Sequence, residues 1–549
     1  MMTVAIQWTA DQQKAIDGRK GTMLVSAAAG SGKTAVLVER VIRRICDEEN
    51  PCGVENLLIV TFTNAAAAQM KEKIHKAISK KIALDPTDKR LRRQQMMLPC
   101  ADICTIDSFC INIVRENFHT LGISPDFTLL DEGKKAVLGA QAVATVVDSL
   151  HKNPSDNFLA LTELISDTRD DKPLIAAIQK LYKLSQAYPF PELWLESLAK
   201  EFSSPSPVEE SVWGRTIINH GIQLICTCIA DADHCIKVLA AEPELEAKYR
   251  PAIEEDRQMF ENLLDALSSK SWNGICEAFS DISYAKSGNA PKGYTGAAKE
   301  ICQSTRKAYK ARLDGFAALL KITEEDHQKD IAVLSPIIDE LISAVFKYGE
   351  EFRRLKDEEN AVDFNDTLHL ALKLLVEPAD GGYVKTPLAL ALCENYAEIL
   401  VDEYQDVNEA QDMIFNALSK NESNLFMVGD VKQSIYRFRQ AMPEIFLARR
   451  DGLEEYVDGN YPAKVTLGKN FRSRKGITET VNFIFSSLMS RDAGGLEYDK
   501  NEYLEAAASY PESNGADTEI CLIEAEKEDL HSCQAKYVAN YIEMPLQAV

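Results

Sequence analysis

Short apolar runs and longer helical repeats alternate at both ends of the chain. Residues 23–26 (Met-Leu-Val-Ser) form the first run, and Val38, Val41, Ile42 and Ile45 follow at helical spacing. Comparable apolar runs occur at residues 57–62, 399–401, 425–428 and 465–467. Each run is short enough for a buried strand and ends in small or polar residues. These parts of the chain therefore predict an open α/β sheet.

The pattern changes between about residue 130 and residue 350. Apolar residues there recur at helical spacing, with little strand signal between the repeats. The clearest helical stretches are residues 136–150, 174–188, 217–239, 252–267, 297–320 and 331–355. Loops are predicted at the Ser- and Pro-rich residues 203–207 and at residues 283–296. We expect a large all-helical insertion, and the sequence reveals no chemistry in it.

Composition limits the class of protein more than its function. A chain of 549 residues is too long for one core, so several domains are expected. The 46% hydrophobic and 26% charged residues are typical of a soluble globular protein. No apolar run approaches the ~20 residues that span a bilayer, and the first residues lack a signal pattern. We expect a cytoplasmic protein without a membrane partner.

The cysteine content and the net charge exclude few classes of protein. The 13 cysteines form no paired C-x-x-C units and only 8 histidines accompany them, so we expect reduced, mostly buried thiols. The net charge of −23 is unusual for a nucleic-acid binder. A single strand, however, needs only a locally basic groove with aromatic side chains. The net charge therefore neither supports nor excludes DNA.

The loop after the first apolar run has the pattern of a phosphate-binding loop. Backbone N–H groups there would converge on an anion at the N-terminus of the following helix. Lys33 would reach the β- and γ-phosphates of ATP, and the Thr34 hydroxyl would hold Mg²⁺. The pattern is imperfect because Ala27 replaces the first glycine, and a chance Gly-Lys-Thr loop is the alternative. The predicted nucleotide contacts are Ala27, Ala28, Ala29, Gly30, Ser31, Gly32, Lys33 and Thr34.

Polar side chains after later strands predict the other half of this site. Asp402 is suited to hold Mg²⁺ through a water, and Glu403 to accept a proton from an attacking water. Gln433 is an amide suited to sense the γ-phosphate or orient that water. Arg472 is a cation for charge that develops on the transferred phosphoryl group. An Asp-Glu pair alone is usually solvent-facing, but beside a phosphate loop it favours ATP hydrolysis.

Aromatic residues near strand ends predict a strand-binding surface. Phe62, Tyr436 and Phe438 offer flat faces for bases, and Arg437 and Arg439 offer cations for phosphates. Core packing is the alternative for any one of these rings. Their place at the ends of strands, where an open α/β sheet binds ligands, favours the binding surface.

The ordered set of motifs resembles the UvrD/Rep-type superfamily 1 DNA helicases. Gln12 resembles the adenine-reading glutamine of the first motif, and residues 27–34 resemble the Walker A loop. The other resemblances are residues 61–67 to motif Ia, 105–109 to the next strand-contact motif, 363–366 to the segment before motif II, 402–406 to motif II, 428–439 to motif III and 470–473 to motif IV. The resemblance implies a RecA-like P-loop NTPase with a parallel sheet. The DNA contacts that it implies are Phe62, Asn64, Ser108, Tyr436, Phe438 and Arg439.

Residues 402–408 and 429–439 are most similar to the AddA-type helicase–nucleases. This resemblance implies 3′–5′ translocation on single-stranded DNA, a role in double-strand-break end resection and recombinational repair, and an exonuclease in the full-length protein. It also implies DNA ends as substrate and an AddB-like partner in a heterodimer. Two residues depart from the pattern: Asp107 replaces a histidine, and Phe438 replaces the usual tryptophan platform.

The resemblance also divides the chain. We expect residues 1–129 and 351–455 to form the first motor domain, residues 130–350 the helical insertion and residues 456–549 the beginning of a second RecA-like domain. Motifs V and VI and a nuclease motif are not found after Ser473. The chain is therefore expected to be an N-terminal portion of a longer protein that hydrolyses ATP weakly by itself.

Two other functions remain open from the sequence. One is a non-catalytic DNA- or partner-binding module with a vestigial ATP site, although the intact Lys33, Asp402 and Glu403 argue against it. The other is a P-loop ATPase that acts on RNA.

Overall fold

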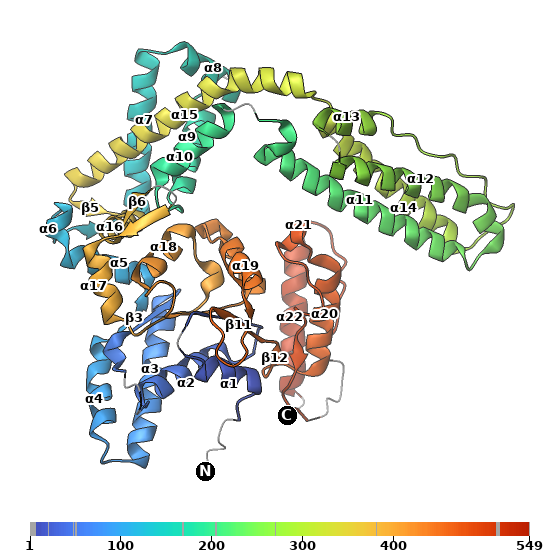
Figure 1. The fold of residues 1–549 in the computed structure, drawn as a ribbon. Coiled ribbons are helices and arrows are strands. Elements are labelled where there is room, and N and C mark those ends of the chain that lie inside the picture. Colours follow the sequence, from blue (N-terminus) through green and yellow to red (C-terminus); the bar gives the residue numbers. More distant parts are fainter. Residues whose placement is uncertain are drawn as a thin grey trace. The chain divides into compact units, whose positions relative to one another are not determined.

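The computed structural model of the chain describes residues 7–19, 21–47, 49, 52–166, 170–203, 206–269, 271–379, 382–511 and 517–547. Part of the loop predicted at 203–207 lies outside these residues. The chain divides into two compact units. The first comprises residues 1–129, 186–189 and 362–549, and the second comprises residues 130–185 and 190–361. Figure 1 shows the elements of both.

A seven-stranded sheet forms the centre of the first unit. Its strands are β1 (Met23–Ala27), β2 (Leu57–Thr61), β3 (Asp102–Thr105), β8 (Glu398–Val401), β9 (Leu425–Gly429), β10 (Glu454–Glu455) and β11 (Ala463–Leu467). They lie in the order β10-β11-β1-β9-β8-β2-β3, and all six neighbouring pairs are parallel. The predicted α/β fold with a parallel sheet is confirmed, and the carboxyl ends of these strands meet at one edge.

Strand β11 joins this sheet beside β1, with Val465 opposite Val25. The sequence alone predicts that residues from 456 onward begin a second domain. The side chains of Ala463, Val465 and Leu467 are buried, because they complete the apolar core next to β1. The sheet of the first unit therefore extends to Leu467.

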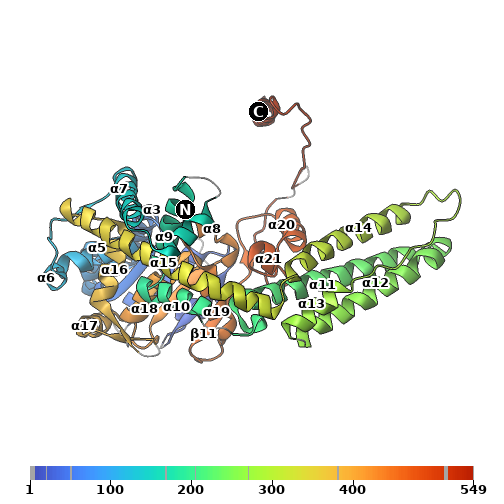
Figure 2. The ribbon, with the colours of Figure 1, turned by 90° about the horizontal axis from the view of Figure 1, so that it is seen from above.

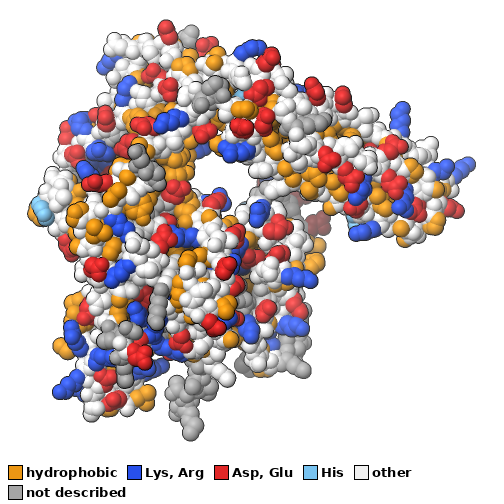
Figure 3. Space-filling view, in the orientation of Figure 1, with side chains coloured by type: hydrophobic (Ala, Val, Ile, Leu, Met, Phe, Trp, Pro, Cys, Tyr) orange, Lys and Arg blue, Asp and Glu red, His pale blue; other side chains and the backbone are white. Residues whose placement is uncertain are grey.

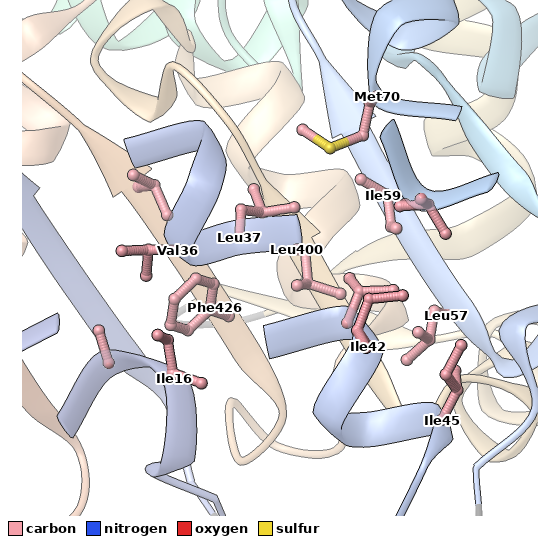
Figure 4. Close-up of a cluster of buried hydrophobic side chains, with 14 of the residues drawn as sticks. Ile16, Val36, Leu37, Ile42, Ile45, Leu57, Ile59, Met70, Leu400 and Phe426 are labelled. Carbon is pink, nitrogen blue, oxygen red and sulfur yellow. The ribbon is translucent and has the colours of Figure 1, made fainter. Parts of the chain in front are cut away.

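Three helices cover one face of the sheet: α1 (Ala10–Asp17), α2 (Lys33–Ile45) and α3 (Asn64–Leu84). Figure 4 shows Leu37 and Ile42 of α2 in the same cluster as Leu400 and Phe426 of the strands, with Met70 of α3 at its edge. All five side chains are buried. Apolar residues at helical spacing thus pack on strands that are apolar throughout, which fixes α2 directly behind the loop that precedes it.

The first unit also contains further helices and three short strand pairs. The helices are α4 (Lys89–Met97), α5 (Ile106–Glu116), α6 (Phe118–Leu121), α16 (Phe364–Leu375), α17 (Pro387–Asn395), α18 (Glu409–Leu418), α19 (Pro443–Gly452), α20 (Lys475–Leu488), α21 (Arg491–Gly494) and α22 (Leu530–Gln547). Short strand pairs are formed by β4 (Thr128–Leu129) with β5 (Ala361–Val362), β6 (Val376–Ala379) with β7 (Gly382–Lys385) and β12 (Lys469–Asn470) with β13 (Glu505–Ala506). Helix α16 packs against both α5 and α18.

Basic residues gather on α3 and α4 despite the negative net charge. The exposed side chains are Lys73, Lys76, Lys80, Lys89, Arg92 and Arg93. Figure 3 shows Lys and Arg side chains over this part of the first unit. The charge of −23 is therefore distributed unevenly over the surface.

Helices are the main elements of the second unit. It contains α7 (Glu132–Lys152), α8 (Asp156–Ile165), α9 (Lys172–Ser185), α10 (Pro191–Ser203), α11 (Val212–Leu239), α12 (Pro243–Ser269), α13 (Trp272–Ser280), α14 (Ala297–Ala317) and α15 (Glu324–Glu358). One core joins α11 to α14, where α11 lies side by side with α12 and α14 (Figure 2), and another joins α7 to α10 with α15. Because α15 is continuous to Glu358, this unit extends beyond residue 350.

Two absences hold for the part of the chain that the structure describes. No helix there is both long and apolar enough to cross a bilayer. All 13 cysteines are free thiols, among them Cys52, Cys110 and Cys235, which are buried.

The interior strand β8 provides a test of the core. Leu400→Ala removes a fully buried side chain from β8 and should lower the free energy of unfolding by about 2–5 kcal/mol. Leu84→Ala, at a position that is 86% exposed, is the control and should change it by less than about 0.5 kcal/mol. Urea unfolding followed by far-UV circular dichroism measures both. Equal effects of the two substitutions would contradict the burial of β8.

Candidate functional site

The loop between β1 and α2 is curved tightly by two glycines. Gly30 and Gly32 have φ angles of +72° and +86°, in the left-handed region that favours glycine. A Cβ on Gly30 would also lie 2.8 Å from the side-chain nitrogen of Asn470. Helix α2 begins directly after the loop, at Lys33. Its first N–H groups, which have no partners within the helix, are available to an anion at this end.

Three donors hold carbonyl oxygens of the loop. The Nε2 of Gln12 donates to the Ser31 oxygen, and the Nδ2 of Asn470 donates to the Ala29 oxygen, both at 2.9 Å. The backbone N–H of Phe471 donates to the Gly30 oxygen at 2.9 Å. The loop is therefore tied both to α1 and to the segment after β11.

Gln12 was predicted to contact adenine. In the structure its side chain is buried, and its Oε1 accepts a hydrogen bond from the Thr9 N–H at 3.0 Å in a capping box. Asn470 was not among the predicted site residues, although it opens the segment that resembles motif IV. A single amide carries no chemical pattern of its own, so its position in that motif was the only available signal.

The sheet brings Lys33 to the acidic pair. The Lys33 Nζ lies 3.5 Å from the Glu403 Oε2. The neighbouring Asp402 directly follows β8, and its Oδ1 accepts the Glu403 N–H at 3.1 Å. Only β9 separates β8 from β1, so residues 370 positions apart meet at one edge.

Burial disfavours the charged form of two carboxyl groups at this edge. The pKa of Asp402 is raised to about 6, first by burial and second by the charge of Glu403, against the opposing charge of Lys33. The pKa of Asp406 is also raised to about 6, by burial and then by Glu403. A bound cation would favour the ionised forms.

The donor set at this edge fits Mg²⁺. The buried Ser31 Oγ and Asp406 Oδ1 have no hydrogen-bond partner among the described residues. The side chains of Thr34 and Asp402 carry oxygen atoms, the type of donor that Mg²⁺ prefers. Across the described ranges no group of three or more His, Cys, Asp and Glu side chains is placed to hold a metal ion. A Mg²⁺ site that uses phosphate oxygens and water as its other ligands needs no such group.

Gln433 ends the short turn after β9, and Arg472 follows β12. The Gln433 Nε2 donates to the Asp430 Oδ2 at 2.7 Å. Arg472 is exposed, and its backbone N–H donates to the Asn470 Oδ1 at 2.8 Å. Asn470 donates a hydrogen bond to the phosphate loop. Arg472 therefore lies two positions along the chain from a residue that holds this loop.

The predicted aromatic residues form one cluster. The ring centroids of Phe62 and Tyr436 are 4.6 Å apart, and those of Tyr436 and Phe438 are 5.6 Å apart. The Arg439 guanidinium carbon lies 5.8, 5.3 and 5.9 Å from the centroids of Phe62, Tyr436 and Phe438. Phe438 is 68% exposed, so one ring of the cluster offers its surface to a ligand.

The other predicted DNA contacts lie in the first turns of α3 and α5. Asn64 is the exposed first residue of α3, and the hydroxyl of Ser108 in α5 lies 2.9 Å from the Thr105 hydroxyl. Asp107 stands where the family has a histidine. Burial raises the pKa of its carboxyl group, against the opposing charge of Arg439. The ends of β2 and β3 thus share an edge with the aromatic cluster.

A parallel sheet with a phosphate loop after β1 and an acidic pair after β8 defines a P-loop NTPase. The chain belongs to the UvrD/REP helicase family: the family model of the UvrD/REP helicase N-terminal domain matches residues 8–453. This confirms the family predicted from the motifs.

Curated relatives named as one subunit of an ATP-dependent helicase/nuclease are similar over most of this chain. The protein of Lachnoclostridium phytofermentans is 38% identical over 519 residues, which are 92% of this chain and 37% of the relative. That of Acetivibrio thermocellus is 36% identical over 548 residues, covering 96% and 43%. That of Clostridioides difficile is 34% identical over 540 residues, covering 95% and 42%. The chain spans about two fifths of the length of these relatives.

The raised pKa of Asp402 predicts a pH-dependent stability. The unfolded chain releases this proton near its ordinary pKa of 3.8, whereas the folded chain releases it at about 6. The free energy of unfolding therefore falls as the pH rises through this window. Asp402→Asn removes that loss and should stabilise the fold at pH 8 by up to about 3 kcal/mol, with no gain at pH 4.

Urea unfolding of the variant and the wild type at both pH values measures this effect. Glu394→Gln, at an exposed position on α17, is the matched control and should be neutral at both. A gain that is the same at pH 4 and pH 8 would contradict the burial of the Asp402 charge.

Proposed function

We propose that this chain is the ATP-binding motor portion of an AddA-type DNA helicase, which couples ATP hydrolysis to 3′–5′ movement along single-stranded DNA. The observation that carries the proposal is the approach of Lys33 to Glu403, next to Asp402, at the same sheet edge as the cluster of Phe62, Tyr436, Phe438 and Arg439. Membership in the UvrD/REP helicase family supports it.

Each residue of the nucleotide site has a part in the proposed reaction. The N–H groups at the start of α2 and the Lys33 ammonium bind the phosphates, and Gln12 binds adenine after giving up its contact with the loop. Thr34 and Asp402 would hold Mg²⁺, which would supply positive charge to the phosphate oxygens. Glu403 accepts the proton of the attacking water, Gln433 orients that water, and Arg472 stabilises charge on the phosphoryl group.

The aromatic cluster is the proposed site of the moving strand. Bases stack on the exposed face of Phe438, while Arg439 contacts phosphates, and Asn64 and Ser108 extend the contact along the edge. Gln433 and Phe438 belong to one short segment after β9. A shift of this segment during hydrolysis would move the stacking ring, which gives the coupling a direct structural route.

The wider role is proposed from the relatives. Their names describe one subunit of a helicase/nuclease, which implies a second subunit in those proteins. We propose an AddB-like partner and action on DNA ends in recombinational repair. Co-purification of the full-length protein with such a partner, and ATP-dependent degradation of linear but not circular duplex DNA, are the expected results.

The acidic pair predicts the first catalytic test. Glu403→Gln should lower kcat for ATP hydrolysis by about 10²–10⁴-fold, because it removes the proton acceptor, and should leave nucleotide binding intact. Lys33→Ala should weaken nucleotide binding itself. Glu394→Gln is the control that retains wild-type hydrolysis. A Glu403→Gln variant with unchanged kcat would favour the non-catalytic module with a vestigial ATP site.

The aromatic cluster predicts the strand-binding test. Phe438→Ala should weaken binding of single-stranded DNA by about 1–3 kcal/mol, since it removes a stacking face, and Phe438→Trp should retain it. Phe483→Ala, at another exposed phenylalanine, is the control. Fluorescence anisotropy with labelled DNA, competed by RNA of the same sequence, measures the loss. Stronger competition by RNA would contradict DNA as the substrate.

A further inference from the structure

A buried glutamine connects the two halves of the site. Gln405 is 1% exposed and lies in the short turn Tyr404–Asp406 after β8. Its Nε2 donates to the Glu403 Oε2 at 2.9 Å, and its Oε1 accepts the backbone N–H of Asp430 at 2.9 Å. Its carbonyl oxygen accepts a hydrogen bond from the Ser434 hydroxyl at 3.3 Å. One side chain thus spans from the end of β8 to the end of β9.

The end of β9 is shaped to receive this amide. A Cβ at Gly429 would lie 2.6 Å from the Gln405 Oε1, so only glycine permits the approach. The next residue, Asp430, is buried, and its carboxylate accepts the Gln433 Nε2 and lies 3.1 Å from the Lys432 Nζ. Contacts of both its backbone N–H and its carboxylate therefore fix Asp430 in place. The segment 430–439 begins at this fixed residue.

Glu403 depends on outside support for its orientation. Its φ of +53° places a non-glycine residue in the left-handed region, which is unfavourable for most side chains. Its side chain is 36% exposed, so little packing restricts its rotamers. Besides Lys33, the contact that orients its carboxylate is the hydrogen bond from Gln405.

We propose that Gln405 is a positioning residue, which holds the Glu403 carboxylate for ATP hydrolysis and ties its orientation to the segment 430–439 that carries the strand-binding aromatics. The inference rests on the proposed function of this site in ATP hydrolysis. An amide suits the task because it donates to a carboxylate through its nitrogen and accepts a backbone N–H through its oxygen; a carboxylate of the same shape can only accept. Strand binding that shifts segment 430–439 thereby moves Glu403, and nucleotide binding at Glu403 acts back on strand affinity.

Gln405→Glu tests the donor while it retains the acceptor. In the 549-residue chain, kcat for strand-stimulated ATP hydrolysis should fall by about 10–100-fold, with KM for ATP within about twofold of wild type. The acidic limb of the pH profile of kcat should move to higher pH, because two adjacent carboxylates resist simultaneous ionisation.

Gln94→Glu is the matched control. Gln94 is 5% exposed, lies on α4 and likewise accepts a backbone N–H through its Oε1, from Val54 at 2.6 Å. It should leave kcat, KM and the pH profile unchanged. A Gln405→Glu variant with the kcat and pH profile of wild type, or losses equal to those of Gln94→Glu, would overturn the proposal.

Hydrogen exchange tests the tie to the aromatic segment without hydrolysis. In Gln405→Ala, amides of residues 429–439 should exchange at least about tenfold faster than in wild type, whereas Gln94→Ala leaves them unchanged. Unchanged exchange rates would show that Gln405 does not hold this segment in place, and would contradict its proposed connection to Glu403. If the wild-type chain binds but never hydrolyses ATP, the proposed function itself fails. If it hydrolyses ATP and only the Gln405 variants behave as wild type, the positioning role alone fails.

Discussion

The parallel order of the central sheet is the constraint on which the site depends. Because β1, β9, β8, β2 and β3 are neighbours and all run in one direction, the segments that follow them leave from a single edge. Lys33 follows β1, Glu403 follows β8 and Phe62 follows β2. Reversal of any one strand would send its segment to the opposite edge. The chemistry therefore rests on strand direction and strand order, which are maintained by apolar burial on the faces of the sheet.

The edge that results is electrostatically unsatisfied. The carboxyl groups of Asp402 and Asp406 are buried enough to raise each pKa to about 6, and the Ser31 hydroxyl lacks a partner among the described residues. Buried polar groups without partners, and carboxyl groups with raised pKa values, are typical of a site that binds charged ligands. The helices that pack on the sheet stabilise the fold around this site, since one apolar core of the first unit includes β1 and α2 on either side of the phosphate loop.

The sequence predicted those features that depend on residues close together in the chain. Apolar runs identified the strands because these are buried on both faces, and the Gly-Lys-Thr loop and the Asp-Glu pair have recognisable spacing. Pairing partners are not local: nothing in Val465 indicates that it lies opposite Val25. The same limit concealed Gln405 and Asn470. An amide acquires its role only from the carboxylate, carbonyl or N–H that the fold places beside it.

The position of β1 has a consequence for synthesis of the chain. Its two neighbours, β9 and β11, leave the ribosome roughly 400 residues after it. At ~5–20 residues per second, the apolar strand that precedes the phosphate loop waits about 20–80 s for the partners that flank it. During that time both of its edges expose unpaired backbone groups, the condition that invites aggregation and engages chaperones. The chain thus passes through a nascent state in which its first strand lacks both of its neighbours.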